Sequence, residues 1–492
     1  MTTRIIVFAL YFLGIFAIGL YSMRKTRDES DYWIAGGNLG WGLGGVTLAA
    51  THVSGGTFIG AVGAIHAFGW SFGWVLISIP LAYWFMAAVL APRLMGTREL
   101  TLPSFIERRY YSKTARAIAA VIIMVAIMVY MQAQIVAGGL VANIAFGVPL
   151  THGVVFFAIL LLAYTVVGGM LAVVYADFVQ MIIMLLGTVV ALPLALRQIG
   201  GAGNLLHYAE LTNPLALEWG TLPAALLFTM GLAFFLGSVA TPEKIVRLYS
   251  MRDMHQIRRG ILLTIIMVVT LNLMIMVLGL VSVVLFPTLP TGDLAMPMIA
   301  RAVLPAFIGS LMLAAITSAI MSTAEALLIV AGSALSEDIF QTFFQRSASP
   351  RRRLIVGRIG VFIVGAAPLL FVLTGIGKGE LIQLIVLLFS ALMAASFFAP
   401  VIGGIFWRRA TREGAIAAML LGVTSAGAWK LWGAEAIDPV LPGFVVSVAA
   451  FVVVSLLTPP PPASALAPYF PEERAGEEAE PTGRASRPAK GA

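Results

Sequence analysis

Long apolar segments follow one another along this chain with little polar sequence between them. A helix that crosses a bilayer needs roughly 20 mostly apolar residues, and its backbone groups must be bonded within the segment because lipid offers them no partner. Thirteen stretches meet this requirement: 4–22, 41–65, 70–92, 115–146, 150–169, 172–196, 222–242, 258–286, 303–335, 354–376, 380–407, 413–432 and 439–457. The chain is therefore predicted to be an all-α polytopic membrane protein with thirteen transmembrane helices.

Composition excludes several other classes of protein. Of the 492 residues, 60% are hydrophobic and only 11% are charged, against about 25% charged residues in a soluble domain. Cysteine is absent, so the chain has no disulfide, thiolate metal site or cysteine nucleophile. The net charge of +8 fits cytoplasmic loops of a membrane protein, so we expect a lipid bilayer and no nucleic acid as partner.

The basic residues predict an orientation. With the N-terminus outside, 22 of the 31 lysines and arginines fall in alternate, cytoplasmic loops and 5 in outer loops; Lys244 and Arg247 count among the cytoplasmic ones. This bias predicts a multi-pass protein of the cell (inner) membrane with a cytoplasmic C-terminus. Met23-Arg24-Lys25 follows the first span in place of a small-residue cleavage site, so we read that span as a retained helix.

Residues 458–492 differ from the rest of the chain, since they are rich in Pro, Ala, Glu and Arg. They carry too little apolar surface to fold alone, so we expect a disordered cytoplasmic tail. No G-x-x-x-x-G-K-[ST] loop for ATP, nucleophile elbow or H-E-x-x-H pair occurs. We therefore expect neither direct ATP drive nor an enzyme.

Two of the apolar segments are interrupted midway. The second span contains Thr51, His52, Ser54, Gly55, Gly56 and Thr57, and the seventh contains Gly237-Ser238 with Thr241-Pro242 below them. Glycine unwinds easily and proline leaves a carbonyl without its helical donor, so each break frees carbonyl oxygens that a cation can satisfy. Paired broken helices indicate a transporter with inverted repeats and a midplane site, although Gly and Pro are also common at close helix contacts.

At these residues the chain resembles the sodium:solute symporter family, over about residues 4 to 457. The resemblance rests on residues 31–40 (DYWIAGGNLG), 100–110 (LTLPSFIERRY), 168–169 (GG) with 175–180 (YADFVQ), 319–323 (AIMST) with 336–338 (SED), and 414–415 (GA). It implies a LeuT-like fold of two inverted five-helix repeats that work by alternating access. The first added helix would be 4–22, repeat one about 41–196, repeat two about 222–407, and the last two added helices about 413–457.

The family motif implies a sodium site. Sodium prefers several oxygen ligands, which the resemblance assigns to the hydroxyls of Ser322 and Thr323 and to the carbonyls of Ala50, Val53 and Ala319. From spacing alone another interpretation is favoured, because Ser and Thr in helices usually bond the carbonyl four residues earlier. We expect sodium to be the coupling ion and no organic cofactor.

Asp177 and Glu325 are carboxylates within apolar spans, which makes them functional candidates by default. They form a possible second cation or proton site, although Glu325 departs from the small hydroxyl residues of family members with a second sodium site. The alternative is structural: Asp177 caps its helix near water and Glu325 pairs with a loop arginine.

Candidate substrate residues lie on both broken helices and on span four. They are His52, Ser54, Gly55, Gly56, Tyr130, Gln134, Phe234 and Ser238. Tyr130 and Gln134 are four apart and share one helix face, and His52 replaces the acidic residue of the proline symporters. The alternative for His52 is a local hydrogen bond within the helix core.

These residues predict a sodium-coupled symporter that imports a small organic solute, most simply a carboxylate of the pantothenate or monocarboxylate type. The alternatives are a proline-type amino-acid symporter, a proton-coupled carrier on the same fold and a non-transporting membrane sensor. The sequence names neither the solute nor the stoichiometry, and the oligomeric state is unknown.

Overall fold

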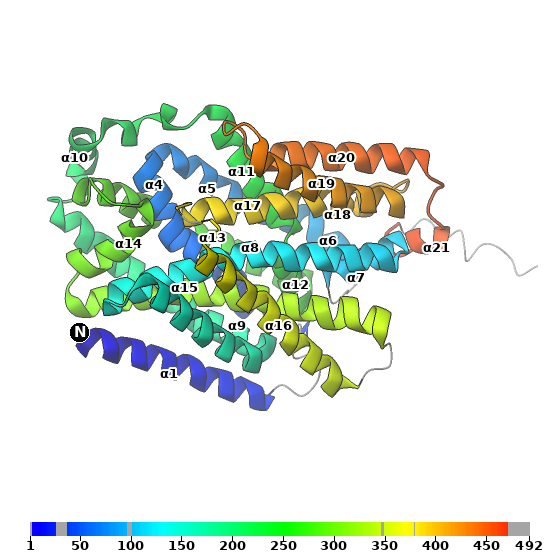
Figure 1. Cartoon of the computed structure of the whole chain (residues 1–492), viewed down its shortest axis with the longest axis horizontal. Coiled ribbons are helices and arrows are strands. Elements are labelled where there is room, and N and C mark those ends of the chain that lie inside the picture. Colours follow the sequence, from blue (N-terminus) through cyan, green and yellow to red (C-terminus); the bar gives the residue numbers. More distant parts are fainter. Residues whose placement is uncertain (1, 26–36, 96–100, 346–348, 378, 471–492) are drawn as a thin grey trace, which may run out of the picture.

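The computed structural model describes residues 2–25, 37–95, 101–345, 349–377 and 379–470, and within these ranges the chain is helical without a β-strand. Figure 1 shows the long helices packed side by side, most of them roughly along one direction. In chain order the main helices are α1 (Thr2–Lys25), α3 (Trp41–His52), α4 (Val62–Phe68), α5 (Gly73–Phe85), α7 (Leu102–Tyr110), α8 (Lys113–Phe146), α9 (Leu150–Gln198), α10 (Leu205–Thr212), α11 (Ala224–Ala240), α12 (Pro242–Ser250), α13 (Met254–Leu285), α15 (Ala306–Ser333), α16 (Pro350–Thr374), α17 (Ile382–Met393), α18 (Ala399–Phe406), α19 (Arg412–Trp432) and α20 (Val440–Leu457).

The helices agree with a polytopic membrane protein. Ten helical runs in the described ranges are long and apolar enough to cross a bilayer, and two bent pairs bring the number to as many as twelve. The all-helical membrane class is thus confirmed, whereas the number thirteen stays a prediction. The bent pairs are Trp41–His52 with Gly56–Phe68, and Ala224–Ala240 with Pro242–Ser250.

The long helix α9 contains both the fifth and the sixth predicted spans. Its Tyr164 packs edge-on against Phe16 of α1, with 5.7 Å between ring centroids, whereas its Gln180 donates to the hydroxyl of Tyr11 at 3.3 Å. Sixteen residues of straight helix extend about 24 Å, but Tyr11 and Phe16 are only about 7 Å apart along α1. The two halves of α9 are therefore not collinear, and each half passes along α1.

Helix α15 lies at the centre of the bundle. Every residue of its apolar 18-residue window is buried inside the protein, and a helix that is apolar all round belongs in such a position. The outer helices instead present large apolar side chains to the surroundings, such as Trp84, Phe362 and Leu457. These exposed side chains form the surface that a bilayer covers.

Two glycines let helices α3 and α13 approach each other closely. A Cβ atom on Gly45 of α3 would lie 2.5 Å from the carbonyl oxygen of Gly260 on α13. Thr264 donates to the carbonyl of Gly45 at 2.9 Å across the same contact. Small residues of this kind let two membrane helices pack backbone to backbone, and here they hold the first broken helix against α13.

The end of the described chain folds back onto the bundle. After α20, the short helix α21 (Ala463–Leu466) leads to Tyr469 and Phe470, which are both buried. The buried guanidinium of Arg109 lies 6.0 Å and 5.8 Å from their ring centroids. Residues 458–470 therefore have defined positions, which corrects the predicted start of a disordered tail; residues 471–492 lie outside the described residues.

Candidate sodium and substrate site

Both predicted spans are broken, but the second break lies at Thr241 and not at Gly237-Ser238, which belong to the continuous helix α11. The first pair bends by 54° between His52 and Gly56, and the second bends by 42° where Thr241 separates α11 from α12. Val53, between the halves of the first pair, has an extended backbone with φ −73° and ψ 103°, so it cannot continue the helical ladder. The two breaks thus take backbone out of regular hydrogen bonding inside the bundle.

A hydrogen-bond network holds the first break open. The backbone N–H of Ser54 donates to the hydroxyl of Thr57 at 3.2 Å, and that hydroxyl donates to the carbonyl of His52 at 3.4 Å. The N–H of Gly55 donates to the side-chain oxygen of Gln134 at 3.1 Å. A Cβ on Gly55 would lie 2.9 Å from that same oxygen, so this position needs glycine for the close approach.

The five residues predicted to bind sodium come together between α3 and α15. Ser322 donates to the carbonyls of Ala50 at 3.0 Å and of Ala319 at 3.2 Å. Thr323 lies 3.4 Å from the carbonyl oxygen of Val53 and donates to the carbonyl of Thr51 at 3.0 Å. Hydroxyls of α15 therefore meet carbonyls of the first broken helix at buried contacts, and neutral hydroxyl and carbonyl oxygens are ligands that suit a hard monovalent cation.

The alternative for these hydroxyls was a bond to their own helix. Two neighbours on α15 behave in that way: Thr317 donates to the carbonyl of Leu313 and Ser318 to that of Ala314, both at 2.9 Å. Ser322 and Thr323 reach across to carbonyls of α3, although Ser322 additionally bonds Ala319 of its own helix. The difference lies in position, because only the latter pair faces the unwound carbonyls of the first break.

Asp177 and Glu325 have different surroundings. Both side chains are fully buried. Asp177 accepts a hydrogen bond from Thr47 and lies 3.4 Å from the guanidinium of Arg247. Neither carboxylate oxygen of Glu325 has a hydrogen-bond partner in the described part of the chain. Asp177 thus pairs with an arginine within the bundle, and Glu325 has no arginine partner among the residues that the structure describes.

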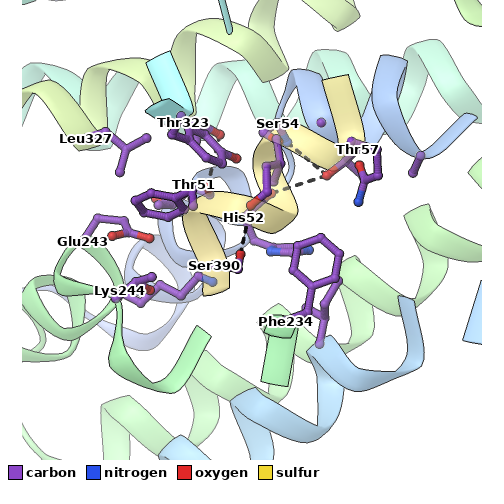
Figure 2. Close-up of a pocket in the computed structure, with 18 of the residues that line it drawn as sticks. Thr51, His52, Ser54, Thr57, Phe234, Glu243, Lys244, Thr323, Leu327 and Ser390 are labelled. Atoms are coloured by element: carbon purple, nitrogen blue, oxygen red, sulfur yellow. Dashed lines mark hydrogen bonds between the residues drawn. The ribbon is translucent and has the colours of Figure 1, made fainter. Parts of the chain in front are cut away.

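A pocket lies beside the predicted sodium-binding residues and is drawn in Figure 2. Five predicted substrate residues line it: His52, Ser54, Gly56, Tyr130 and Phe234. The other three lie just behind its wall, since Gly55 and Gln134 bond one another and Ser238 accepts from Lys244 at 2.8 Å. Thr323 lines the same pocket, so the predicted sodium site and the pocket share this residue.

Comparisons with known proteins agree with this arrangement. The model of the sodium:solute symporter family matches residues 32–422. The chain belongs to this family. Its relatives are likewise transporters and not enzymes: the osmoregulated proline transporter OpuE of Bacillus subtilis is 27% identical over 93% of this chain and 95% of its own length. The sodium/proline symporter of Escherichia coli is 27% identical over 94% and 95% of the two chains.

Solved structures share the fold of this chain. A sodium-coupled sialic acid symporter in a substrate-bound, outward-open state superposes with a TM-score of 0.80 at 18% identity, over 93% of this chain and 98% of that one. A nucleobase-cation-symport-1 family transporter in a closed conformation gives 0.59 at 13% identity, over 90% and 99%. The resemblance seen in the sequence motifs is thus confirmed at the level of family and fold.

Several polar residues of the pocket were not predicted from the sequence. Glu243, Lys244, Asn272, Gln383 and Ser390 line it, and Figure 2 shows Glu243 and Lys244 together at one side of the pocket. Lys244 is only 7% exposed and Arg247 is fully buried, so both are wrongly counted among cytoplasmic-loop residues in the charge analysis. Pro242 marks the start of a new helix, but the sequence carries no signal that this helix runs inside the bundle.

Proposed function

We propose that this chain is a sodium-coupled symporter that imports a small organic solute with a carboxylate group. The supporting observation is the bonding of Ser322 and Thr323 to the carbonyls of Ala50 and Thr51, next to a pocket that Thr323 also lines. A sodium ion bound by Ala50, Val53, Ala319, Ser322 and Thr323 joins α3 to α15. That contact fixes the wall of the pocket, so ion and solute each raise the affinity for the other.

The solute is of the proline type. The curated relatives that match almost the whole chain are proline transporters or sodium/proline symporters, and proline carries the predicted carboxylate. The pocket is lined by polar residues such as His52 and Lys244 and by apolar residues such as Phe234 and Phe389, which suits a small solute with one charged end and an apolar ring. These relatives favour an amino acid over a pantothenate-like solute or a simple monocarboxylate.

Glu325 supports a second candidate mode of coupling. Asp177 already has Thr47 and Arg247 as partners, so Glu325 is the freer member of the predicted pair and would carry a second cation or a proton. A buried carboxylate without partners favours its neutral form. Proton coupling on the same fold thus remains the alternative to a second sodium ion.

The proposed topology has thirteen spans: one added helix, two inverted repeats of five, and two further helices. The additional span relative to the twelve counted by length is the apolar helix Leu150–Val166, the first half of α9. The N-terminus would lie outside and the C-terminus in the cytoplasm of the cell membrane. Alternating access would then rock one helix bundle around the two broken helices.

Uptake into proteoliposomes tests the proposed function. Purified protein is reconstituted, and accumulation of labelled proline is measured with an inward sodium gradient, with an inward proton gradient, and with neither. We expect accumulation that requires sodium. Accumulation driven equally well by protons in sodium-free buffer would overturn sodium coupling, and failure to accumulate proline while another carboxylate accumulates would overturn the proposed solute.

A further inference from the structure

Two oppositely charged side chains enter the pocket from adjacent positions in the chain. Glu243 and Lys244 lie in the first turn of α12, directly after the second helix break, and both line the pocket. Glu243 is 4% exposed and Lys244 is 7% exposed. Ionised groups buried in a membrane protein mark binding sites by default, because burial without a partner is costly.

Among the described residues, the hydrogen-bond partner of Lys244 is a neutral hydroxyl. Its ammonium donates to the hydroxyl of Ser238 at 2.8 Å and lies 5.8 Å from the ring centroid of Tyr83. In the part of the chain that the structure describes, no carboxylate lies within ion-pair distance of the Lys244 ammonium. Asp177 forms its ion pair with Arg247. An ammonium group has three protons to donate, so Lys244 retains donors for an anion.

Glu243 offers a hydrogen-bond acceptor where Lys244 offers donors. Its Oε2 atom is buried and has no hydrogen-bond partner in the ranges the structure describes, and an ionised carboxylate is an acceptor only. Consecutive helix residues point in directions about 100° apart, so Glu243 and Lys244 leave α12 in different directions although both lie at the same side of the pocket. His52 adds a buried Nε2 atom without a partner to the same cavity.

We propose that Glu243 and Lys244 form the charge-recognition pair of the solute site, in which Lys244 binds the carboxylate and Glu243 binds the ammonium of a small zwitterionic amino or imino acid. This inference rests on the proposed function and names the groups that select its solute. A zwitterion gives each buried charge an opposite charge to pair with. A solute with a carboxylate but no ammonium group would offer no cation to Glu243. A solute with an ammonium but no carboxylate group would offer no anion to Lys244.

The test measures sodium-dependent binding of three ring compounds to the full-length protein. Proline has both charges, pyrrolidine lacks the carboxylate, and cyclopentanecarboxylate lacks the amine. For the wild-type chain we expect either analogue to bind roughly 10- to 100-fold more weakly than proline, which is the effect of losing a hydrogen bond between charged groups.

Each substitution should abolish the preference for proline over one of the two analogues and keep the preference over the other. Lys244→Met should lower proline affinity to the level of pyrrolidine, while proline still binds better than cyclopentanecarboxylate. Glu243→Gln should do the reverse, and Lys244→Arg should keep part of the carboxylate preference. Lys430→Met is the matched control, because Lys430 pairs with Glu380 at 3.0 Å in a partly exposed ion pair away from this pocket.

The outcomes separate the inference from the proposed function. Variants that bind all three compounds with equally reduced affinity, or that keep both discriminations, would overturn the charge-recognition pair while the wild-type chain still transports proline. Absence of sodium-dependent proline binding by the wild-type chain would overturn the proposed solute, and this inference with it. Sodium-dependent protection against thermal unfolding, measured for each variant, confirms that the substituted proteins are folded.

Discussion

The hydroxyl of Ser322 on α15 lies 3.0 Å from the carbonyl oxygen of Ala50 on α3, 272 positions earlier in the chain. This contact joins the central buried helix to the edge of the first break. It explains why two ordinary residue types carry a specific site: the hydroxyls meet carbonyls that the break has released from the helical ladder. The following predictions test the surroundings of this contact.

The packing of α3 on α13 depends on Gly45. Gly45→Ala places a Cβ 2.5 Å from a backbone oxygen of Gly260, and backbone cannot yield as a side chain tip can. We expect a loss of roughly 1–3 kcal/mol or more in stability and loss of uptake. Gly42→Ala on the same helix meets nothing within 4 Å and should leave both unchanged. Equal melting temperatures of the two variants in detergent would contradict this packing.

The buried pair of Asp177 and Arg247 should be sensitive to removal of one partner. Asp177→Asn leaves the guanidinium buried without its counter-charge, which costs about 3–5 kcal/mol in comparable pairs. Arg252→Ala breaks an exposed ion pair with Asp253 and should cost less than about 1 kcal/mol. Thermal unfolding of the two variants distinguishes the cases, and an Asp177→Asn protein as stable as wild type would show that the pair is not ionised.

Glu325 decides the second candidate mode of coupling. Because neither of its carboxylate oxygens has a partner among the described residues, Glu325→Gln preserves shape and removes only the ability to carry a proton or balance a cation. We expect sodium-driven uptake to persist and any response of uptake to an imposed pH gradient to disappear. A pH-gradient response identical to that of the wild-type chain would assign proton movement to another group.

Asp438, between α19 and α20, should make stability depend on pH. Burial raises the pKa of its carboxyl to about 7, although Lys430 and the N–H of Val440 act in the opposite direction. The unfolded chain loses this proton near pH 4, so between about pH 4 and 7 the folded state binds more protons and stability falls as pH rises. Asp438→Asn should flatten that decline in the melting temperature; a wild-type melting temperature that rises over this range would contradict the assignment.

The positions of the helix breaks could be predicted from the sequence better than the positions of the buried charged residues. Gly55-Gly56 and Thr241-Pro242 mark the two breaks because glycine and proline act locally, and the structure has breaks at both places. Gly237-Ser238, which were predicted to interrupt the same span, lie within the continuous helix α11. Ser322 and Thr323 could not be told from Thr317 and Ser318 by spacing. That distinction depends on which helix lies opposite, and only the family motif supplied it.

Lys244 and Arg247 show why the rest was not predictable. Basic residues after an apolar span usually lie in cytoplasmic loops, and nothing in a linear reading says that α12 continues inside the bundle. Their burial depends on the 42° bend after α11, which turns the next residues toward α3 and α9. The pairing of Asp177 with a residue 70 positions away likewise requires the tertiary fold.

Sodium dependence of uptake in four matched variants tests the central claim most directly. Ser322→Ala and Thr323→Val remove hydroxyls that cross to the broken helix, whereas Ser318→Ala and Thr317→Val remove hydroxyls that bond their own helix. The account predicts that the first two raise the half-saturating sodium concentration by about tenfold or more, as expected for a lost bond to a charged group, while the other two stay near wild type. An unchanged sodium dependence in both Ser322→Ala and Thr323→Val would contradict it.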